Sequence, residues 1–126
     1  MILLDSDVLI DIFDARSARG GHALDAIAAS GDGVGTTSIN LHEVAFGVVK
    51  RSGNLEDLLR FPVLPYTREN AVLSSRIEAG LEKKGTAARR ADAMIASIAI
   101  GASCPLYTFD RRHFEPMKDF GLALFG

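Results

Sequence analysis

The chain has 126 residues, 48% of them hydrophobic and 24% charged, which is the composition of a globular protein rather than of a disordered one. The 14 Lys and Arg residues and the 16 Asp and Glu residues leave a formal net charge of −2, which argues against a generally basic surface for nucleic acid or membranes. The single Cys104 excludes an intrachain disulfide and a zinc site built on thiolates. A chain of this length buries about two-thirds of its unfolded surface. We therefore expect one domain over residues 1–126.

Short apolar runs alternate along the chain with segments of helical pattern. In chain order we expect strand 2–4, helix 8–13, helix 18–30, strand 34–37, helix 40–50, a helical turn at 55–60, an extended segment at 62–65, helix 67–84, helix 87–103, strand 106–108, a short helix or turn at 110–114 and a last strand at 122–125. This alternation predicts an α/β fold, a three-layer α/β/α sandwich with a mainly parallel sheet of roughly five strands. No stretch is apolar and long enough to span a membrane, and no signal peptide is recognisable, so we expect a cytoplasmic protein.

Acidic residues come at the ends of the predicted strands or early in the helices that follow. Asp5 ends the first strand, Glu43 lies in the first turn of the helix after the second, Asp92 lies early in the buried helix and Asp110 follows the fourth strand. Ligands of open α/β sheets collect outside the carboxyl ends of the strands, so we expect these four acids to meet there. Converging carboxylates repel one another unless a cation neutralises them. Oxygen ligands of this kind select Mg²⁺ or Mn²⁺ over zinc.

Each acid also has a purely structural explanation. Asn40 and Glu43 fit a capping box at the start of a helix. Asp92 lies where a helix dipole favours negative charge, and Asp5 and Asp110 can each cap a following helix or turn. Taken singly, each acid is better explained as a cap, whereas their convergence at one edge favours a metal site.

Four segments of the chain carry these acids within recognisable motifs. They are an apolar strand ending in Asp (ILLDSDVLID, 2–11), a helix with an acid four residues before a glycine (TSINLHEVAFG, 37–47), an Asp followed by Ile-Ala on a helix (ADAMIA, 91–96), and a strand followed by an Asp (LYTFDRRHF, 106–114). In this order the four blocks resemble those of PIN domains. The length of the chain and the Glu-to-Gly block resemble the VapC-like toxin branch of that family.

The resemblance implies a Mg²⁺- or Mn²⁺-dependent endoribonuclease, the toxin of a type II toxin–antitoxin pair, with a small antitoxin protein as its partner and a homodimeric assembly. By motif position, Asp5, Glu43, Asp92 and Asp110 would be the catalytic residues that hold the metal. In such a site the metal activates water and stabilises the negative charge that develops on the phosphate.

Three further residues follow from the same motifs. Ser6 and Thr108 match positions that orient the acids or their waters. Asp7 departs from the family pattern, which has Ser, Asn or another small polar residue there. We expect Asp7 to be either an additional acid near the metal or a helix cap.

Two arginine pairs lie beside the proposed catalytic acids in the sequence: Arg89 and Arg90 before Asp92, and Arg111 and Arg112 after Asp110. We expect these four arginines to contact RNA phosphates, although a solvated surface explains each one alone. The chain has no Trp, two Tyr and no aromatic stripe on which bases could stack, so no base-reading residues are assigned.

Two other classes of protein remain open. Asp5-Ser6-Asp7 after an apolar strand resembles the first motif of aspartyl-phosphate phosphatases of the haloacid dehalogenase type, but the chain lacks their later acidic motif and is short for a cap and a core. A phosphoacceptor receiver domain has this length, but it needs an Asp after the central strand, where the chain has PVLPY (62–66), and a Lys-Pro after the last strands. Phosphoryl transfer from acetyl phosphate distinguishes these classes from a nuclease, and we expect none.

Overall fold

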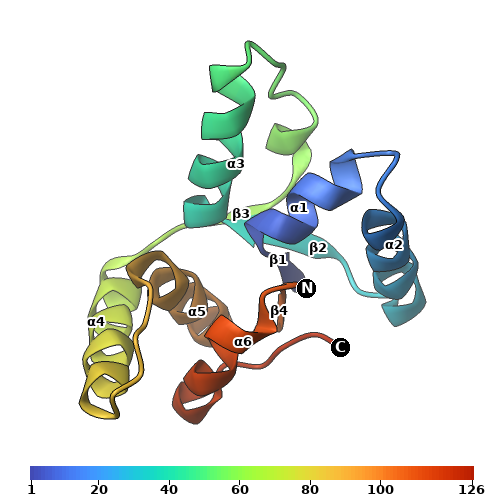
Figure 1. The fold of residues 1–126 in the computed structure, drawn as a ribbon. Coiled ribbons are helices and arrows are strands. Elements are labelled where there is room, and N and C mark those ends of the chain that lie inside the picture. The colour runs from blue at the N-terminus through green and yellow to red at the C-terminus, as the bar shows by residue number, and fades with distance from the viewer.

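The computed structural model describes residues 1–126, in which strands and helices alternate as predicted (Figure 1). In chain order the strands and α-helices are β1 Ile2–Leu4, α1 Ser6–Phe13, α2 Ala18–Ser30, β2 Val34–Thr37, α3 Ser38–Lys50, β3 Val63–Leu64, α4 Arg68–Lys83, α5 Arg90–Ala102, β4 Leu106–Tyr107 and α6 Arg111–Phe114. Two short 3₁₀ helices, η1 Leu58–Arg60 and η2 Glu115–Phe120, complete the chain. The predicted α/β class is confirmed.

The sheet has four parallel strands in the order β3-β2-β1-β4. The expected fifth strand at 122–125 is reduced to a single parallel bridge between Leu106 and Leu124. Its two hydrogen bonds run from the Leu106 N–H to the Ala123 carbonyl and from the Phe125 N–H to the Leu106 carbonyl. Because β4 is itself only two residues long, the final segment has no room to form a longer ladder.

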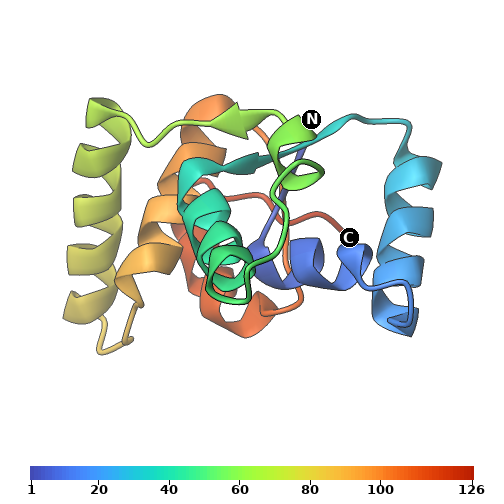
Figure 2. The ribbon, with the colours of Figure 1, turned by 90° about the horizontal axis from the view of Figure 1, so that it is seen from above.

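The alternating side chains of β1 separate two hydrophobic cores. Leu3 packs into a core formed with α4, α5, α6 and η2, whereas Ile2 and Leu4 pack into a second core formed with α1, α2 and α3. All three side chains are fully buried, as a parallel strand covered on both faces requires. Figure 2 shows α4 and α5 on one side of the sheet and α2 on the other, which confirms the three-layer arrangement.

The start of α1 agrees with the capping scheme that the sequence suggested, whereas the start of α3 differs from it. The Asp5 side chain caps α1, as expected, by accepting from the first N–H of that helix. Thr37 caps α3, its side chain accepting from the Asn40 N–H at 3.1 Å. The proposed capping box of Asn40 and Glu43 is therefore wrong, because α3 begins at Ser38 and places Glu43 in the second turn.

Helix α5 is largely buried, as its almost uninterrupted apolar pattern predicted. It begins at Arg90 rather than near residue 87, so Asp92 lies in its first turn and Arg89 occupies the cap position. Helices α4 and α5 lie side by side (Figures 1 and 2). None of the helices combines the length and the hydrophobicity that a membrane-spanning segment requires.

Candidate active site

An acidic pocket of about 230 Å³ lies beside the carboxyl ends of β1 and β4. All four predicted acids line it, although each comes from a different part of the fold: Asp5 follows β1, Glu43 lies on α3, Asp92 lies on α5 and Asp110 follows β4. The parallel sheet brings them together because the carboxyl ends of its strands share one edge. The residues lining this pocket are Asp5, Ser6, Asp7, Glu43, Arg89, Ala91, Asp92 and Asp110.

Asp5 is held by hydrogen bonds to both of its carboxylate oxygens. Asn40 Nδ2 donates to Oδ1 at 2.8 Å, and Thr108 Oγ1 donates to Oδ2 at 2.7 Å. The Ser6 N–H also donates to Oδ1, at 2.9 Å. Asp5 is 7% exposed and Asn40 fully buried, so water competes little for these bonds. The Asp5 carboxylate therefore cannot rotate without breaking buried hydrogen bonds.

Glu43 joins the same network through Ser6. The Ser6 hydroxyl accepts from Asn40 Nδ2 at 2.9 Å and donates to Glu43 Oε1 at 3.0 Å. Burial raises the pKa of Glu43 above its ordinary value; the bond from Ser6 lowers this pKa, and the nearby charge of Asp5 raises it again. The result is a carboxyl that ionises reluctantly, which is typical of acids gathered in one pocket.

Arg89 bridges the two remaining acids. Its Nε donates to Asp92 Oδ2 at 2.6 Å, and its Nη2 donates to Asp110 Oδ2 at 2.5 Å. His113 Nδ1 lies 2.6 Å from the other Asp110 oxygen, Oδ1. Burial raises the pKa of Asp92 in spite of Arg89, whereas the hydrogen bonds from His113 and Arg89 lower the pKa of Asp110. The two acids therefore differ in how readily they ionise.

Asp7 is a fifth acid lining the pocket, on the first turn of α1. The backbone N–H of Phe109 donates to its two carboxylate oxygens at 3.2 and 3.4 Å. Burial, and then the charge of Asp5, raises the pKa of Asp7 to about 6. Asp7 thus ties α1 to the segment that carries Asp110.

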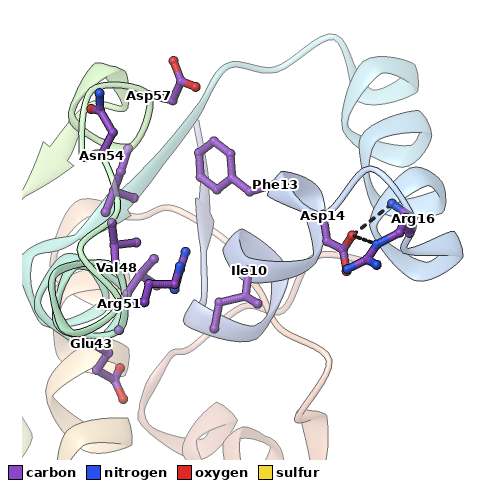
Figure 3. A pocket seen from close by; sticks show the side chains of 12 residues that line it. Ile10, Phe13, Asp14, Arg16, Glu43, Val48, Arg51, Asn54 and Asp57 are labelled. Carbon is purple, nitrogen blue, oxygen red and sulfur yellow. Dashed lines mark hydrogen bonds and ion pairs between the residues drawn. The ribbon is translucent and has the colours of Figure 1, made fainter.

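A larger groove of about 580 Å³ lies between α1 and α3, next to the acidic pocket (Figure 3). Ile10 and Phe13 on α1 face Val48 and Arg51 on the side of α3. Ile10 and Phe13 are 56% and 45% exposed, so together they present apolar surface to the groove. Glu43 lines both this groove and the acidic pocket, so the apolar surface leads directly to the acids.

Comparison with known proteins identifies the family. The PIN domain family model matches residues 2–118.

The chain belongs to the PIN-domain family.

It is 32% identical over 126 residues to Ribonuclease VapC1 of Methanocaldococcus jannaschii, which covers 98% of this chain and 86% of that protein. Among solved structures, the fold is similar to FitAcB from Neisseria gonorrhoeae, with a TM-score of 0.79 and 23% identity over 100% of this chain and 97% of that one. DNA-bound VapBC from Salmonella typhimurium gives a TM-score of 0.77 and 24% identity over 98% of this chain and 95% of that one. The resemblance to VapC-like PIN domains that the sequence indicated is confirmed.

The acids of this PIN domain fit a divalent cation by the chemistry of their donors. All are hard carboxylate oxygens, the type that Mg²⁺ and Mn²⁺ prefer. As the side chains lie, however, no three Asp, Glu, His or Cys residues form a group that could hold a metal ion. The donors are suitable in kind, and the structure gathers them around one pocket without forming such a group.

Of the four arginines expected to contact RNA phosphates, only Arg89 lines the acidic pocket of the PIN domain. Arg90 points away to α4, where its Nε and Nη2 each donate to Glu78 at 3.0 Å. Arg111 donates to the Phe125 carbonyl at 3.1 Å, and Arg112 is exposed. The four arginines, which the sequence suggested would all contact RNA, therefore have different contacts in the structure.

Sequence reasoning missed two residues of the site, Asn40 and His113. The sequence motifs assign no role to His113, yet it follows Asp110 by three residues, a spacing that brings side chains together within a helical turn. Asn40 was interpreted only as a helix cap. Its partner Asp5 lies 35 residues away, so no local pattern could reveal the contact.

Proposed function

We propose that this PIN domain is a Mg²⁺- or Mn²⁺-dependent endoribonuclease and the toxin of a VapBC-like toxin–antitoxin pair. The observation that carries this proposal is the convergence of Asp5, Glu43, Asp92 and Asp110 in one pocket at the carboxyl ends of the strands. The similarity over nearly the whole chain to a protein named Ribonuclease VapC1 supports RNA as the substrate.

The four acids would hold the metal, and their charge explains why a cation is needed. When bound, Mg²⁺ or Mn²⁺ supplies an activated water and stabilises the negative charge that develops on the phosphate. Three of the acids in the pocket, Asp7, Glu43 and Asp92, have a raised pKa because burial disfavours their ionised forms. A cation would relieve that cost by pairing with the carboxylates.

The chain's own polar residues keep the acids in place. Asn40 and Thr108 fix the two oxygens of Asp5, and Ser6 directs one oxygen of Glu43. Such contacts cost little to maintain during a reaction because they are preformed and buried. We assign Ser6, Asn40 and Thr108 as positioning residues, and Asp7 as the residue that holds the Phe109 backbone next to Asp110.

RNA contact by the arginines is a separate part of the proposal. Arg112 is exposed and lies two residues from Asp110, so its guanidinium is available to a phosphate of the bound strand. Changing Arg112 to Ala should weaken RNA binding and lower the slope of log K against log[salt] by about 1. Arg90 and Arg111 have protein partners that they would have to leave first, and we expect smaller effects from their replacement.

A small antitoxin and a second copy of the chain are the proposed protein partners, in the cytoplasm. The similar solved structures include DNA-bound VapBC from Salmonella typhimurium, which supports an antitoxin partner. The exposed Ile10 and Phe13 in the groove between α1 and α3 offer apolar area to such a partner, which could reach Glu43 from there.

The test is cleavage of a labelled structured RNA by the purified protein, with Mn²⁺ and with EDTA. We expect cleavage in Mn²⁺, none in EDTA, and a loss of several orders of magnitude in Glu43→Gln. The control is Glu56→Gln, which changes an exposed glutamate that does not line the pocket. Cleavage that survives EDTA contradicts the metal requirement. Phosphoryl transfer from acetyl phosphate without RNA cleavage would instead support a phosphatase or a receiver domain.

A further inference from the structure

Arg89 is the only basic residue that lines the acidic pocket, where it faces five carboxylates. It contacts two of them with two different nitrogens, Nε to Asp92 and Nη2 to Asp110. These acids come from different elements, one on α5 and the other after β4. Arg89 occupies the cap position of α5, but its side chain makes no capping bond to that helix. The hydrogen bonds of its side chain go to Asp92 and Asp110 instead.

The bridge leaves these acids few free oxygens. Asp110 has both oxygens engaged, Oδ2 by Arg89 and Oδ1 by His113. Asp92 keeps only Oδ1 free, because Arg89 Nε holds Oδ2 at 2.6 Å. As the side chains lie, no three acidic residues of the pocket form a group that could hold a metal ion. A divalent cation that binds Asp92 Oδ2 or Asp110 Oδ2 would therefore compete with the guanidinium for that oxygen.

From these contacts we infer that Arg89 is an internal counterion of the pocket, which must release Asp92 and Asp110 before a divalent cation binds and thereby sets the metal affinity of the site. The inference rests on the proposed function, since it takes the four acids as metal ligands. It differs from a role in RNA contact alone, because it predicts an effect on metal binding when no RNA is present. It also differs from a purely structural ion pair, whose loss would lower stability and leave metal affinity unchanged.

The shape of the Arg89 side chain should affect metal binding as much as its charge does. A guanidinium presents its donors in a fixed fork and can reach two carboxylates at once, whereas a lysine ammonium is a compact point charge. Arg89→Lys therefore keeps the positive charge near the pocket but loses the bridge. Arg89→Gln removes both the charge and the bridge. Comparing the two separates competition for the oxygens from general repulsion of a cation.

The experiment is calorimetric titration of the RNA-free protein with Mn²⁺ for wild type, Arg89→Gln and Arg89→Lys. The matched control is Arg90→Gln, which removes an adjacent arginine that pairs with Glu78 outside the pocket. Arg89→Gln removes two partly exposed ion pairs that wild type must break before the metal binds. From the usual strength of such pairs, we expect Arg89→Gln to bind Mn²⁺ roughly 3- to 30-fold more tightly than wild type. We expect Arg89→Lys to bind more tightly than wild type as well, and Arg90→Gln to bind like wild type.

Several results would overturn the inference. One is an Arg89→Gln affinity equal to or weaker than that of wild type, and another is the absence of Mn²⁺ binding by every form. An Arg89→Lys affinity equal to that of wild type would also overturn it, because charge alone would then set the affinity. If Arg89→Gln fails to fold, as judged by circular dichroism, the Lys variant decides the question. The titration is independent of the cleavage assay: tighter Mn²⁺ binding without RNA cleavage upholds the counterion and contradicts the nuclease.

Discussion

The hydroxyl of Thr108 joins Asp5 to the segment that carries Asp110. Its Oγ1 donates to Asp5 Oδ2 at 2.7 Å and accepts from the Asp110 N–H at 3.0 Å. Thr108 is 3% exposed, so neither partner can readily exchange this bond for one to water. One side chain at the end of β4 thus fixes a carboxylate at the end of β1 and the backbone of a second acid.

Thr108→Val should therefore impair both stability and cleavage. The variant keeps the branched shape but leaves the Asp5 oxygen and the Asp110 N–H without their partner, which predicts a loss of about 1–3 kcal/mol in the free energy of unfolding. Cleavage should fall roughly 10- to 100-fold, as when a group supporting a metal ligand is removed. Urea denaturation and initial cleavage rates measure the two effects. Thr108→Ser retains the hydroxyl and should restore most of both, whereas a fully active Val variant would contradict a positioning role.

Neutralising Asp92 and Asp110 should change the stability of the metal-free protein in opposite directions. Burial raises the pKa of Asp92, so Asp92→Asn should be as stable as wild type in EDTA or more stable. His113 and Arg89 stabilise ionised Asp110 and lower its pKa, so Asp110→Asn should be less stable. Melting temperatures of the three proteins in EDTA measure this contrast.

The same melts in Mn²⁺ test both acids as metal ligands. Each variant should lose most of the rise in Tm that Mn²⁺ gives wild type, because binding to the native state is what raises stability. A loss of about 0.3–1 kcal/mol by Asp92→Asn that is equal in EDTA and Mn²⁺ would mean that Asp92 serves only the helix dipole. Retained RNA cleavage in that variant would lead to the same conclusion.

The adjacent glycines Gly20 and Gly21 on α2 should respond oppositely to alanine. A Cβ at Gly20 would lie 2.0 Å from the Asp11 carbonyl oxygen on α1, so the two helices would have to separate. We expect Gly20→Ala to cost about 1–3 kcal/mol or more. Gly21 has no atom within 4 Å of the same position, and Gly21→Ala should gain roughly 0.5–1 kcal/mol from helix propensity. Urea denaturation measures the free energy of unfolding of both variants. Equal changes in the two would contradict the close contact of α1 with α2.

The link between α1 and α2 should depend on pH through Asp11. Asp11 Oδ2 accepts from Arg19 Nε at 2.7 Å and from Ser17 Oγ at 3.2 Å, and the bond from Arg19 lowers the pKa of Asp11. A lowered folded-state pKa stabilises the protein above the ordinary pKa of an aspartate, and this contribution is lost as the pH falls through the lowered value. At neutral pH, wild type should therefore have a higher melting temperature than Asp11→Asn. This difference in melting temperature should disappear in acid.

The control for that comparison is Asp25→Asn, at an exposed position of α2. Its difference from wild type should not follow the same course with pH. A gap between wild type and Asp11→Asn that is constant from neutral pH down to pH values below the lowered pKa would contradict the charge-assisted bond to Arg19.

Much of the fold could be predicted from the sequence because local patterns determine it. The apolar run at Ile2–Leu4 predicted a central buried strand, and the nearly all-apolar segment after Asp92 predicted a buried helix. Capping was less predictable. Thr37 and Asn40 are both good caps within one turn, and only the point at which β2 ends decides which of them begins α3. The predicted length of the last strand, residues 122–125, was too great. A strand extends only as far as its neighbour offers residues to pair with, and β4 offers only Leu106 and Tyr107.

For the site, the sequence by itself determined which acids belong together, because strand ends and family motifs mark Asp5, Glu43, Asp92 and Asp110. Only the tertiary structure decided what each acid contacts. The partners of Asp5 lie 35 and 103 residues away, at Asn40 and Thr108, and hydrogen bonds over such separations leave no periodic trace in the chain. The contacts of the arginine pair before Asp92 could not be predicted from the sequence either. Arg89 turns into the pocket and Arg90 turns out to Glu78, because the first residues of a helix point in directions that are set by the elements packed around them.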